Sequence, residues 1–273
     1  MNIDMKMDQI NRAIWSAQKW LGWFGQLDGW TDRGEAAAVA WVSDRARGAP
    51  ILDIGVGGGR TVSIMRAISS NYIGIDYTPE LLEVCRARHP GVSFRQMDAR
   101  DMSAFADGSF DLVMFSYNGI DAVDMEGRRA ILRESARILR PGGRLLFSTH
   151  NMLGPGYRES VWKHLPKWSW NPARYGWRIL KMMYALPGAS WNYLRNARFN
   201  QDFDGYAVHV CGAHNFGLVI QFTTLAHQLG ELAKAGLVTE RVLGNETGQA
   251  VRRGDDTREI KWFHFIARKP LEA

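Results

Sequence analysis

The 273-residue sequence predicts a doubly wound α/β fold, in which helices cover both faces of a mostly parallel sheet. The first observation behind this prediction is an alternation of short apolar runs with helical patterns between Pro50 and Asn151. The second is the composition, because 46% hydrophobic and 23% charged residues supply the large core of a globular domain. These two observations exclude the disordered and fibrous classes of protein.

Each element of the alternating region follows from a local pattern. Apolar runs closed by turn residues predict five strands, at 50–54, 71–76, 92–96, 110–116 and 144–149. Helical spacing predicts three helices between them, at 61–69, 79–88 and 125–139. Thr78 and Pro79 occupy the N-cap and the first position of the second helix, and Pro141 with two glycines stops the third.

A second regular region begins at Thr224. A helix that ends at Gly236 is followed by predicted strands at 237–243 and 259–268. The polar loop 244–257 leaves no room for a crossover helix, so these two strands are expected to be antiparallel.

The chain is therefore expected to have an N-terminal helical arm (1–30), a core (31–151 and 218–273) and a lid insertion (152–217). The insertion holds eight basic and three acidic residues, so it carries +5 of the formal net charge of +6. Most of its aromatic side chains are expected to pack within the insertion, and a few to contact substrate. The arm carries an apolar stripe that either packs on the core or helps to close the ligand crevice, formed by Met7, Ile10, Ile14, Ala17, Leu21 and Phe24.

A glycine-rich segment, Ile51-Leu-Asp-Ile-Gly-Val-Gly-Gly-Gly-Arg60, follows the first strand and opens a helix. Its glycines let a ligand approach the backbone, although a dinucleotide fingerprint would have a third glycine where Arg60 stands. Asp76 ends the second strand, 21 residues after Gly55, where a carboxylate can accept both hydroxyls of a ribose. Asp98 follows the third strand and can accept the exocyclic amine of an adenine. A nucleoside-binding crevice is therefore expected at the carboxyl edge of the sheet.

On these motifs, and on the stretch Leu139-Arg-Pro-Gly-Gly-Arg-Leu-Leu-Phe147, the chain resembles the class I S-adenosylmethionine-dependent methyltransferases. The resemblance is strong over residues 31–151 and looser over 224–270. It implies a Rossmann-like sheet of seven strands, mostly parallel with an antiparallel last strand, and S-adenosyl-L-methionine as the cofactor.

The resemblance also implies roles for particular residues around the cofactor. They are Asp53, Gly55 and Gly57 at the methionine part, Asp76 at the ribose, Tyr77, Asp98 and Ala99 at the adenine, and Ser116 and Tyr117 near the reacting methyl. A shielded pocket suits methyl transfer from a sulfonium, and an aromatic lid would provide one.

The acceptor side is predicted from residues at strand ends and in the insertion. A base that takes the acceptor's proton is expected at His150 or, second, at His214, because histidine changes its charge near neutral pH. Tyr117 is the third candidate catalytic residue. The residues expected to bind substrate are Asn118, Asn151, Arg174 and Arg178, the two arginines through a carboxylate or phosphate.

The expected activity is methyl transfer to a small molecule, anionic or aromatic, with the acceptor atom and the oligomeric state left open. An RNA or tRNA methyltransferase that uses the basic insertion is the main alternative, although the motif of amino-directed nucleic-acid enzymes is absent after the fourth strand. A non-catalytic adenosyl-ligand-binding protein and an NAD-dependent oxidoreductase are further alternatives. No metal site or membrane span is predicted, and two isolated cysteines favour the cytoplasm.

Overall fold

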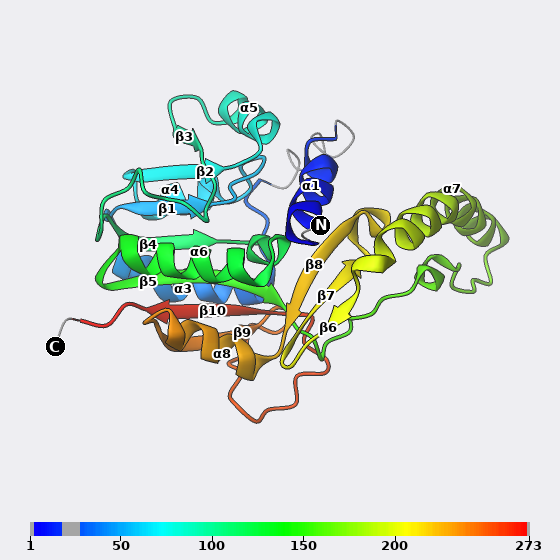
Figure 1. Ribbon diagram of the computed structural model, residues 1–273. Coiled ribbons are helices and arrows are strands. Elements are labelled where there is room, and N and C mark those ends of the chain that lie inside the picture. The colour runs from blue at the N-terminus through cyan, green and yellow to red at the C-terminus, as the bar shows by residue number, and fades with distance from the viewer. Residues whose placement is uncertain (1–2, 18–27, 272–273) are drawn as a thin grey trace.

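A computed structural model describes residues 3–17 and 28–271, and its centre is a seven-stranded sheet (Figure 1). The strand order is β3-β2-β1-β4-β5-β10-β9. The strands are β1 (Ile51–Ile54), β2 (Tyr72–Asp76), β3 (Ser93–Gln96), β4 (Phe110–Phe115), β5 (Leu139–His150), β9 (Val238–Gly244) and β10 (Trp262–Arg268). Strand β10 is antiparallel to β5 and β9, and the other pairs are parallel. The predicted fold class, with its antiparallel last strand, is confirmed.

Helices cover both faces of this sheet, as a doubly wound fold requires. They are α3 (Arg33–Ala46), α4 (Val62–Ile68), α5 (Pro79–Arg88), α6 (Met125–Ile138) and α8 (Leu225–Lys234), and a short 3-10 helix, η1 (Gly119–Ala122), follows β4. Helix α5 has the predicted bounds. Helix α3 has no counterpart in the sequence prediction; Asp32 caps it by accepting the Glu35 N–H at 2.8 Å.

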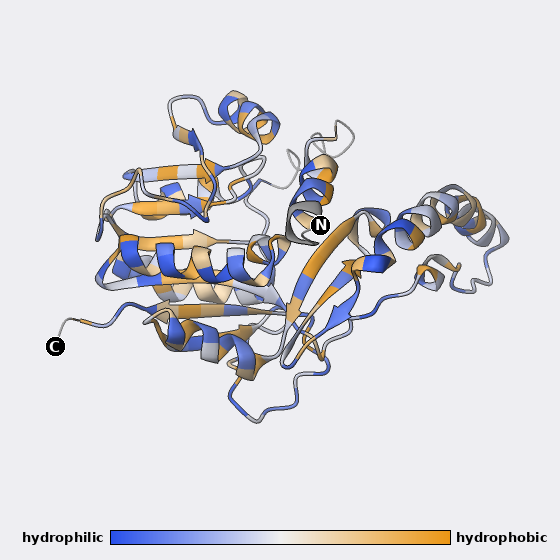
Figure 2. Ribbon diagram, viewed as in Figure 1, coloured by the Kyte–Doolittle hydropathy of each residue, from blue (hydrophilic) through white to orange (hydrophobic). Residues whose placement is uncertain are grey.

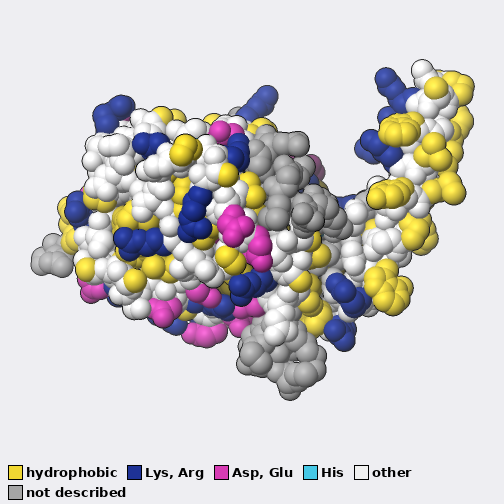
Figure 3. Space-filling model, turned by 90° about the horizontal axis from the view of Figure 1, so that it is seen from above, with side chains coloured by type: hydrophobic (Ala, Val, Ile, Leu, Met, Phe, Trp, Pro, Cys, Tyr) yellow, Lys and Arg dark blue, Asp and Glu magenta, His cyan; other side chains and the backbone are white. Residues whose placement is uncertain are grey.

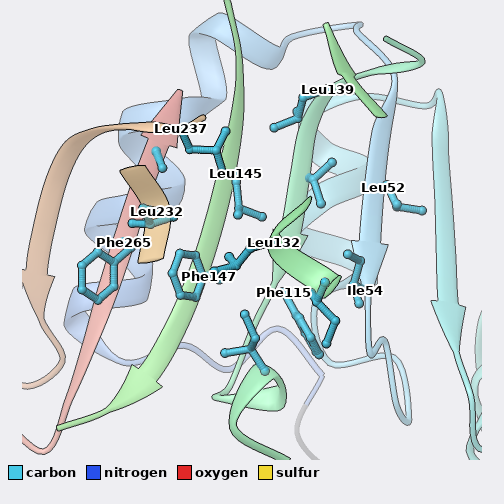
Figure 4. Close-up of a cluster of buried hydrophobic side chains, with 14 of the residues drawn as sticks. Leu52, Ile54, Phe115, Leu132, Leu139, Leu145, Phe147, Leu232, Leu237 and Phe265 are labelled. Atoms are coloured by element: carbon cyan, nitrogen blue, oxygen red, sulfur yellow. The ribbon is translucent and has the colours of Figure 1, made fainter. Parts of the chain in front are cut away.

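Alternation along the strands divides the buried side chains into two cores. Leu145 and Phe147 of β5 point to the face covered by α6 and α8, whereas Leu146 points to the face covered by α3, α4 and α5. Figure 4 shows the first core, where side chains of the strands meet Leu132 of α6 and Leu232 of α8. Strands β4 and β10, which both lie between other strands of the large sheet, are accordingly mostly hydrophobic (Figure 2).

The insertion forms a small sheet and a long helix. Its elements are η2 (Val161–His164), α7 (Pro172–Asn196), η3 (Ala197–Phe199), β6 (Gln201–Asp202), β7 (Tyr206–Cys211) and η4 (Ala213–Phe216). Strand β8 (Leu218–Thr223) pairs antiparallel with β7, so the small sheet runs six residues beyond the expected boundary at 217. Thr224 then caps α8, where the helical pattern was expected to resume. Figure 1 shows the small sheet beside the edge of the core and α7 extending away from it.

The tryptophans of the insertion contradict the expectation that most of its aromatic residues pack internally. Their exposed fractions run from 60% at Trp177 to 91% at Trp170. For Trp177 and Trp191 the physical reason is the position of α7, of which only Ala189 and Asn196 are buried. A helix that extends from the core leaves most of its circumference in water.

The arm forms helix α1 (Ile3–Trp15), which lies between the core and the insertion. Met7 is buried in a cluster with insertion residues such as Phe199 and Phe216. Asn11 is fully buried; its Nδ2 donates to the carbonyls of Ala122 and Val219, and its Oδ1 accepts the Val219 N–H. The last two positions of the predicted stripe, Leu21 and Phe24, lie outside the described residues.

Replacement of Asn11 by alanine should lower the free energy of unfolding by about 1–3 kcal/mol, because it leaves a buried N–H and two carbonyls without partners. Gln9→Ala is the matched control, since Gln9 is exposed on the same helix and its loss should change stability by less than about 0.5 kcal/mol. Urea unfolding measures both variants. Equal stability of the two would contradict the assignment of Asn11 as the anchor of the arm.

Candidate functional site

The glycine loop between β1 and α4 adopts a backbone that only glycine takes readily. Gly55, Gly57 and Gly59 have φ values of 64°, 54° and 92°. A Cβ at Gly55 would lie 2.7 Å from the Phe115 ring, so this glycine also permits close packing. A Cβ at Gly57 would meet no heavy atom nearer than 3.9 Å, so a side chain there would stand in open space beside a ligand.

Asp76, at the end of β2, is held in place by this loop and by the start of α5. Its two carboxylate oxygens accept the backbone N–H groups of Gly57 at 2.9 Å and Thr78 at 2.8 Å. Burial raises the pKa of Asp76, and these hydrogen bonds oppose the shift. Each oxygen keeps one lone pair for a further donor, as a ribose hydroxyl would require.

The loop, Asp76 and the ends of β3 and β4 surround a first cavity of about 920 Å³, a volume that includes the solvent space at its open mouth. Seven of the predicted residues line it: Gly55, Gly57, Asp76, Tyr77, Ala99, Ser116 and Tyr117. One end is apolar, with Leu81 and Met97 beside Tyr77. The cavity therefore offers a carboxylate for a ribose and an apolar slot for a base.

Two of the acids predicted for this site do not line the cavity. Asp53 is fully buried beneath the loop, where its Oδ2 accepts the hydroxyls of Thr61 at 2.5 Å and Tyr72 at 2.8 Å. Asp98 forms an ion pair with Arg100, which also contacts Asp8 of the arm. Burial acts to raise the pKa of Asp98, but Arg100 outweighs it and the pKa is lowered. Asp53 therefore lies beneath the wall of the cavity, whereas Asp98 lines an adjoining hollow that shares Tyr77 and Met97 with the cavity.

A buried ion pair at the mouth of the first cavity was missed by the sequence analysis. Arg60 contacts both carboxylate oxygens of Glu35, at 2.6 and 2.8 Å, and both side chains are buried. Ser116 Oγ contacts the same two groups, and the Arg60 guanidinium lies 5.1 Å from the centre of the Tyr117 ring. The signal that would have found Glu35 is the Asp32-x-x-Glu35 capping pattern before an alanine-rich run.

A second cavity, of about 1020 Å³ with its mouth, adjoins the first. The two share Trp15, Tyr117 and Gly119 as lining residues. Its other polar lining residues are Asn118, His150, Glu159, Lys163, His214, Lys261 and Trp262. His150, His214, Tyr117 and Asn118, predicted from distant parts of the sequence, thus meet in one place.

His150 is the best oriented of the candidate bases. Its Nδ1 lies 2.8 Å from Asp121 Oδ2, and its backbone N–H donates to the same oxygen at 2.8 Å. Asp121 is fully buried, which acts to raise its pKa, but Arg128 and then His150 and Thr149 lower it overall. An ionised Asp121 makes Nδ1 the donor, so Nε2 of a neutral His150 is left to accept a proton.

Asn118 and His214 are also lining residues of the second cavity. Both have left-handed backbone conformations, with φ values of 60° and 50°. Asn118 Oδ1 is buried and has no hydrogen-bond partner in the part of the chain that the structure describes. It is therefore an acceptor that a ligand N–H or O–H could satisfy.

Three of the predicted substrate-binding residues are placed elsewhere, which corrects those expectations. Asn151 is fully buried, donates to the carbonyls of Thr257 and Ile260 and accepts the Leu153 N–H, so it holds a loop. Arg174 and Arg178 lie on α7 and line neither cavity. The direction that α7 takes from the core, which local sequence does not encode, is the reason.

Residues 3–17 and 28–271 contain no cluster of His, Cys, Asp or Glu that could hold a metal ion. Over the same described ranges, no helix combines the length and apolar character required to cross a membrane.

Replacement of Asp53 by asparagine should change how stability depends on pH. Burial raises the pKa of Asp53 to about 6 in the folded protein, above its ordinary value of 3.8. The folded state therefore holds an extra proton between about pH 4 and 6, and Asp53 destabilises it increasingly as the pH rises through this window. Relative to the native protein, the Asn variant should gain up to about 3 kcal/mol between pH 4 and 6.5. Urea unfolding across this range checks the prediction, and a constant difference between the two proteins would contradict it.

Comparison with known proteins agrees with this geometry. Residues 51–143 match the family model described as a methyltransferase domain. The chain is 36% identical over 118 residues to the ubiquinone biosynthesis O-methyltransferase of Xanthomonas oryzae pv. oryzae, over 42% of this chain and 48% of that protein. The protein of the same name from Xanthomonas euvesicatoria pv. vesicatoria is 35% identical over 129 residues, over 45% of this chain and 53% of its own length. The chain thus matches about half the length of these relatives.

Solved structures share the fold across most of the chain. A Mesorhizobium loti S-adenosylmethionine-dependent methyltransferase superposes with a TM-score of 0.53 and 20% identity, over 84% of this chain and 97% of that one. The 1,6-didemethyltoxoflavin-N1-methyltransferase of Burkholderia thailandensis, solved with 1,6-didemethyltoxoflavin and S-adenosylhomocysteine, has a TM-score of 0.52 and 13% identity, over 87% and 78%. Residues 51–143 therefore match a methyltransferase domain, and the seven-stranded sheet has the fold of solved S-adenosylmethionine-dependent methyltransferases.

Proposed function

We propose that the protein is an enzyme that transfers the methyl group of S-adenosylmethionine to a small molecule bound in the second cavity. The observation that carries this proposal is the junction of the two cavities at Trp15, Tyr117 and Gly119. A nucleoside in the first cavity and an acceptor in the second would meet at this junction. Methyl transfer requires such an in-line approach in a shielded place.

The residues around the first cavity fit the proposed cofactor. Asp76 would bind the ribose hydroxyls, and Tyr77 and Met97 would flank the adenine. Gly57 leaves room for the methionine part of the cofactor. When bound, S-adenosylmethionine supplies an electrophilic methyl group on a sulfonium.

The acceptor that we favour carries a hydroxyl group on an aromatic ring. Trp15, Tyr117 and Trp262 provide aromatic walls in the second cavity, and Lys261 adds positive charge that stabilises an acceptor anion. His150 Nε2 would remove the acceptor's proton, while Asp121 stabilises the imidazolium that results. The name of the Xanthomonas relatives, which are O-methyltransferases, supports a hydroxyl acceptor.

The alternatives have less support from the positions of the residues. A nucleic-acid substrate was expected to use the basic insertion, but Arg174 and Arg178 line neither cavity. A dinucleotide would need a glycine at position 60, where Arg60 instead forms a buried ion pair with Glu35. A cytoplasmic location is part of our proposal, and the two buried free thiols, Cys85 and Cys211, are in keeping with it.

Replacement of Asp76 by alanine should weaken S-adenosylhomocysteine binding by about 1.5–3 kcal/mol, because a charge-assisted contact with the ribose is lost. Asp101→Ala is the matched control, since Asp101 is exposed, follows the next strand and lines neither cavity. Calorimetry with S-adenosylhomocysteine and with NADH measures both variants. Tight NADH binding by the native protein, or unchanged S-adenosylhomocysteine affinity in folded Asp76→Ala, would overturn the proposed cofactor.

Replacement of His150 by alanine or glutamine should lower kcat at least about a hundredfold, because neither side chain takes up a proton at neutral pH. Cofactor affinity should stay within about threefold of native. His209→Gln is the control, because His209 is also paired with an aspartate, Asp202, but lines neither cavity. Release of S-adenosylhomocysteine with a panel of small phenols, catechols and amines is the measurement. A Gln variant with native kcat would restrict His150 to orienting the acceptor.

A further inference from the structure

The insertion presents an apolar surface to solvent that neither cavity uses. On α7, five apolar residues lie on one helix face at successive intervals of three, four, seven and three positions: Trp177, Leu180, Tyr184, Trp191 and Leu194. Tyr184 is 91% exposed and Leu194 is 74% exposed. Trp162, Trp168 and Trp170, in the segment before α7, are exposed as well. We call these eight residues the outer surface of the insertion.

Positive charge surrounds this outer surface. Residues 160–200 contain no Asp or Glu and seven basic residues: Lys163, Lys167, Arg174, Arg178, Lys181, Arg195 and Arg198. Within the described part of the chain, only Lys163 among these seven has a carboxylate partner, Glu159. Figure 3 shows the projecting helix with hydrophobic and basic side chains and no acidic ones on the face in view. The other six basic side chains are therefore available to an external anion.

We propose that the outer surface of the insertion docks on an anionic lipid bilayer, with α7 lying in the plane of the interface. Trp and Tyr are the side chains that favour the boundary between headgroups and acyl chains, and Lys and Arg beside them attract anionic lipids. The helix would lie on the bilayer and not cross it, since α7 is not apolar enough to span a membrane. This inference does not depend on the proposed methyl transfer.

Two other partners fit the surface less well. A second copy of this chain, paired through the same region, would bring the basic residues of the insertion close to their own copies, with no carboxylate from residues 160–200 between them. A single-stranded nucleic acid would match the cations and the aromatic rings, but not the exposed aliphatic residues Leu180, Met183 and Leu194. A bilayer satisfies the aliphatic, aromatic and cationic groups together.

Docking on lipid would bring the second cavity close to the membrane. Glu159 and Lys163 belong to the wall of that cavity, and the exposed aromatic segment begins at the neighbouring Trp162. An acceptor dissolved in the bilayer would then have a short path to the second cavity.

Vesicle flotation with the full-length protein tests the proposal. One set of vesicles contains only phosphatidylcholine, and the other contains about three parts phosphatidylcholine to one part phosphatidylglycerol. We expect the protein to float with the anionic vesicles at least about tenfold more than with the neutral ones, and less as salt rises from about 0.1 to 0.5 M. Equal flotation with both sets, or none with either, would overturn the proposal.

Matched double variants locate the contact. Lys167→Glu with Lys181→Glu, and Tyr184→Ser with Trp191→Ser, should each reduce partition to anionic vesicles about tenfold or more. Arg66→Glu with Arg253→Glu makes the same change in net charge outside the insertion, and Val238→Ser with Leu271→Ser removes exposed apolar groups elsewhere. These two controls should float like the native protein.

Two further measurements on the four variants separate loss of lipid binding from loss of the fold or of the cofactor site. Circular dichroism and S-adenosylhomocysteine affinity should be unchanged in all four variants. If the insertion variants float as well as the controls, the proposal is wrong. It is also wrong if light scattering shows a dimer that the insertion variants abolish while flotation persists, because the surface would then join two copies of the chain.

Discussion

The buried carboxylate of Asp121 joins four parts of the core in one hydrogen-bonded group. Asp121 lies in the 3-10 turn after β4, and its carboxylate accepts hydrogen bonds from the Arg128 guanidinium of α6 and the Thr149 hydroxyl of β5. Arg128 also donates hydrogen bonds to Thr149 and to Gln228 of α8. Removal of one partner from such a buried ion pair costs about 3–5 kcal/mol, because the remaining charge stays out of water. The same carboxylate holds His150 by its ring and by its backbone N–H. A single buried charge thus supports both the packing of the core and the orientation of the candidate base.

The two cavities are built in different ways. The first is formed mainly by backbone and by short segments at the carboxyl ends of neighbouring parallel strands, β1, β2, β3 and β4. The second takes its walls from five separated regions: the arm, the turn after β4, the end of β5, the insertion with β8, and the start of β10. Trp15 is where these regions meet, because the Asn11 contacts hold α1 between the core and β8. The first cavity thus depends mainly on the central sheet, whereas the second also depends on how the arm and the insertion pack against it.

The insertion combines two features that rarely coexist on a surface exposed only to water. Contiguous exposed apolar side chains favour association, and a local excess of cations opposes association with a similar surface. Most of α7 lies outside the hydrophobic clusters. Its buried contacts come from its last turns, which pack against the small sheet. The helix is therefore stabilised at one end and presents the other to its surroundings.

The sequence by itself determined the seven strands, the helices between them, the glycine loop and Asp76, because each depends on neighbours a few residues away. Alternation with a period of two separates Leu145 from Leu146, and Thr78-Pro79 starts α5 at the predicted residue. Only the tertiary structure paired His150 with Asp121 and Glu35 with Arg60, because these partners are 29 and 25 residues apart and approach through strand order. The tertiary structure also decides that Asn151 is buried and donates a hydrogen bond to the Thr257 carbonyl. It places Arg174 and Arg178 on a helix that does not line the cavities. A local sequence pattern predicts where a strand or helix ends. The direction in which an insertion leaves the core depends instead on how segments distant in the sequence pack together.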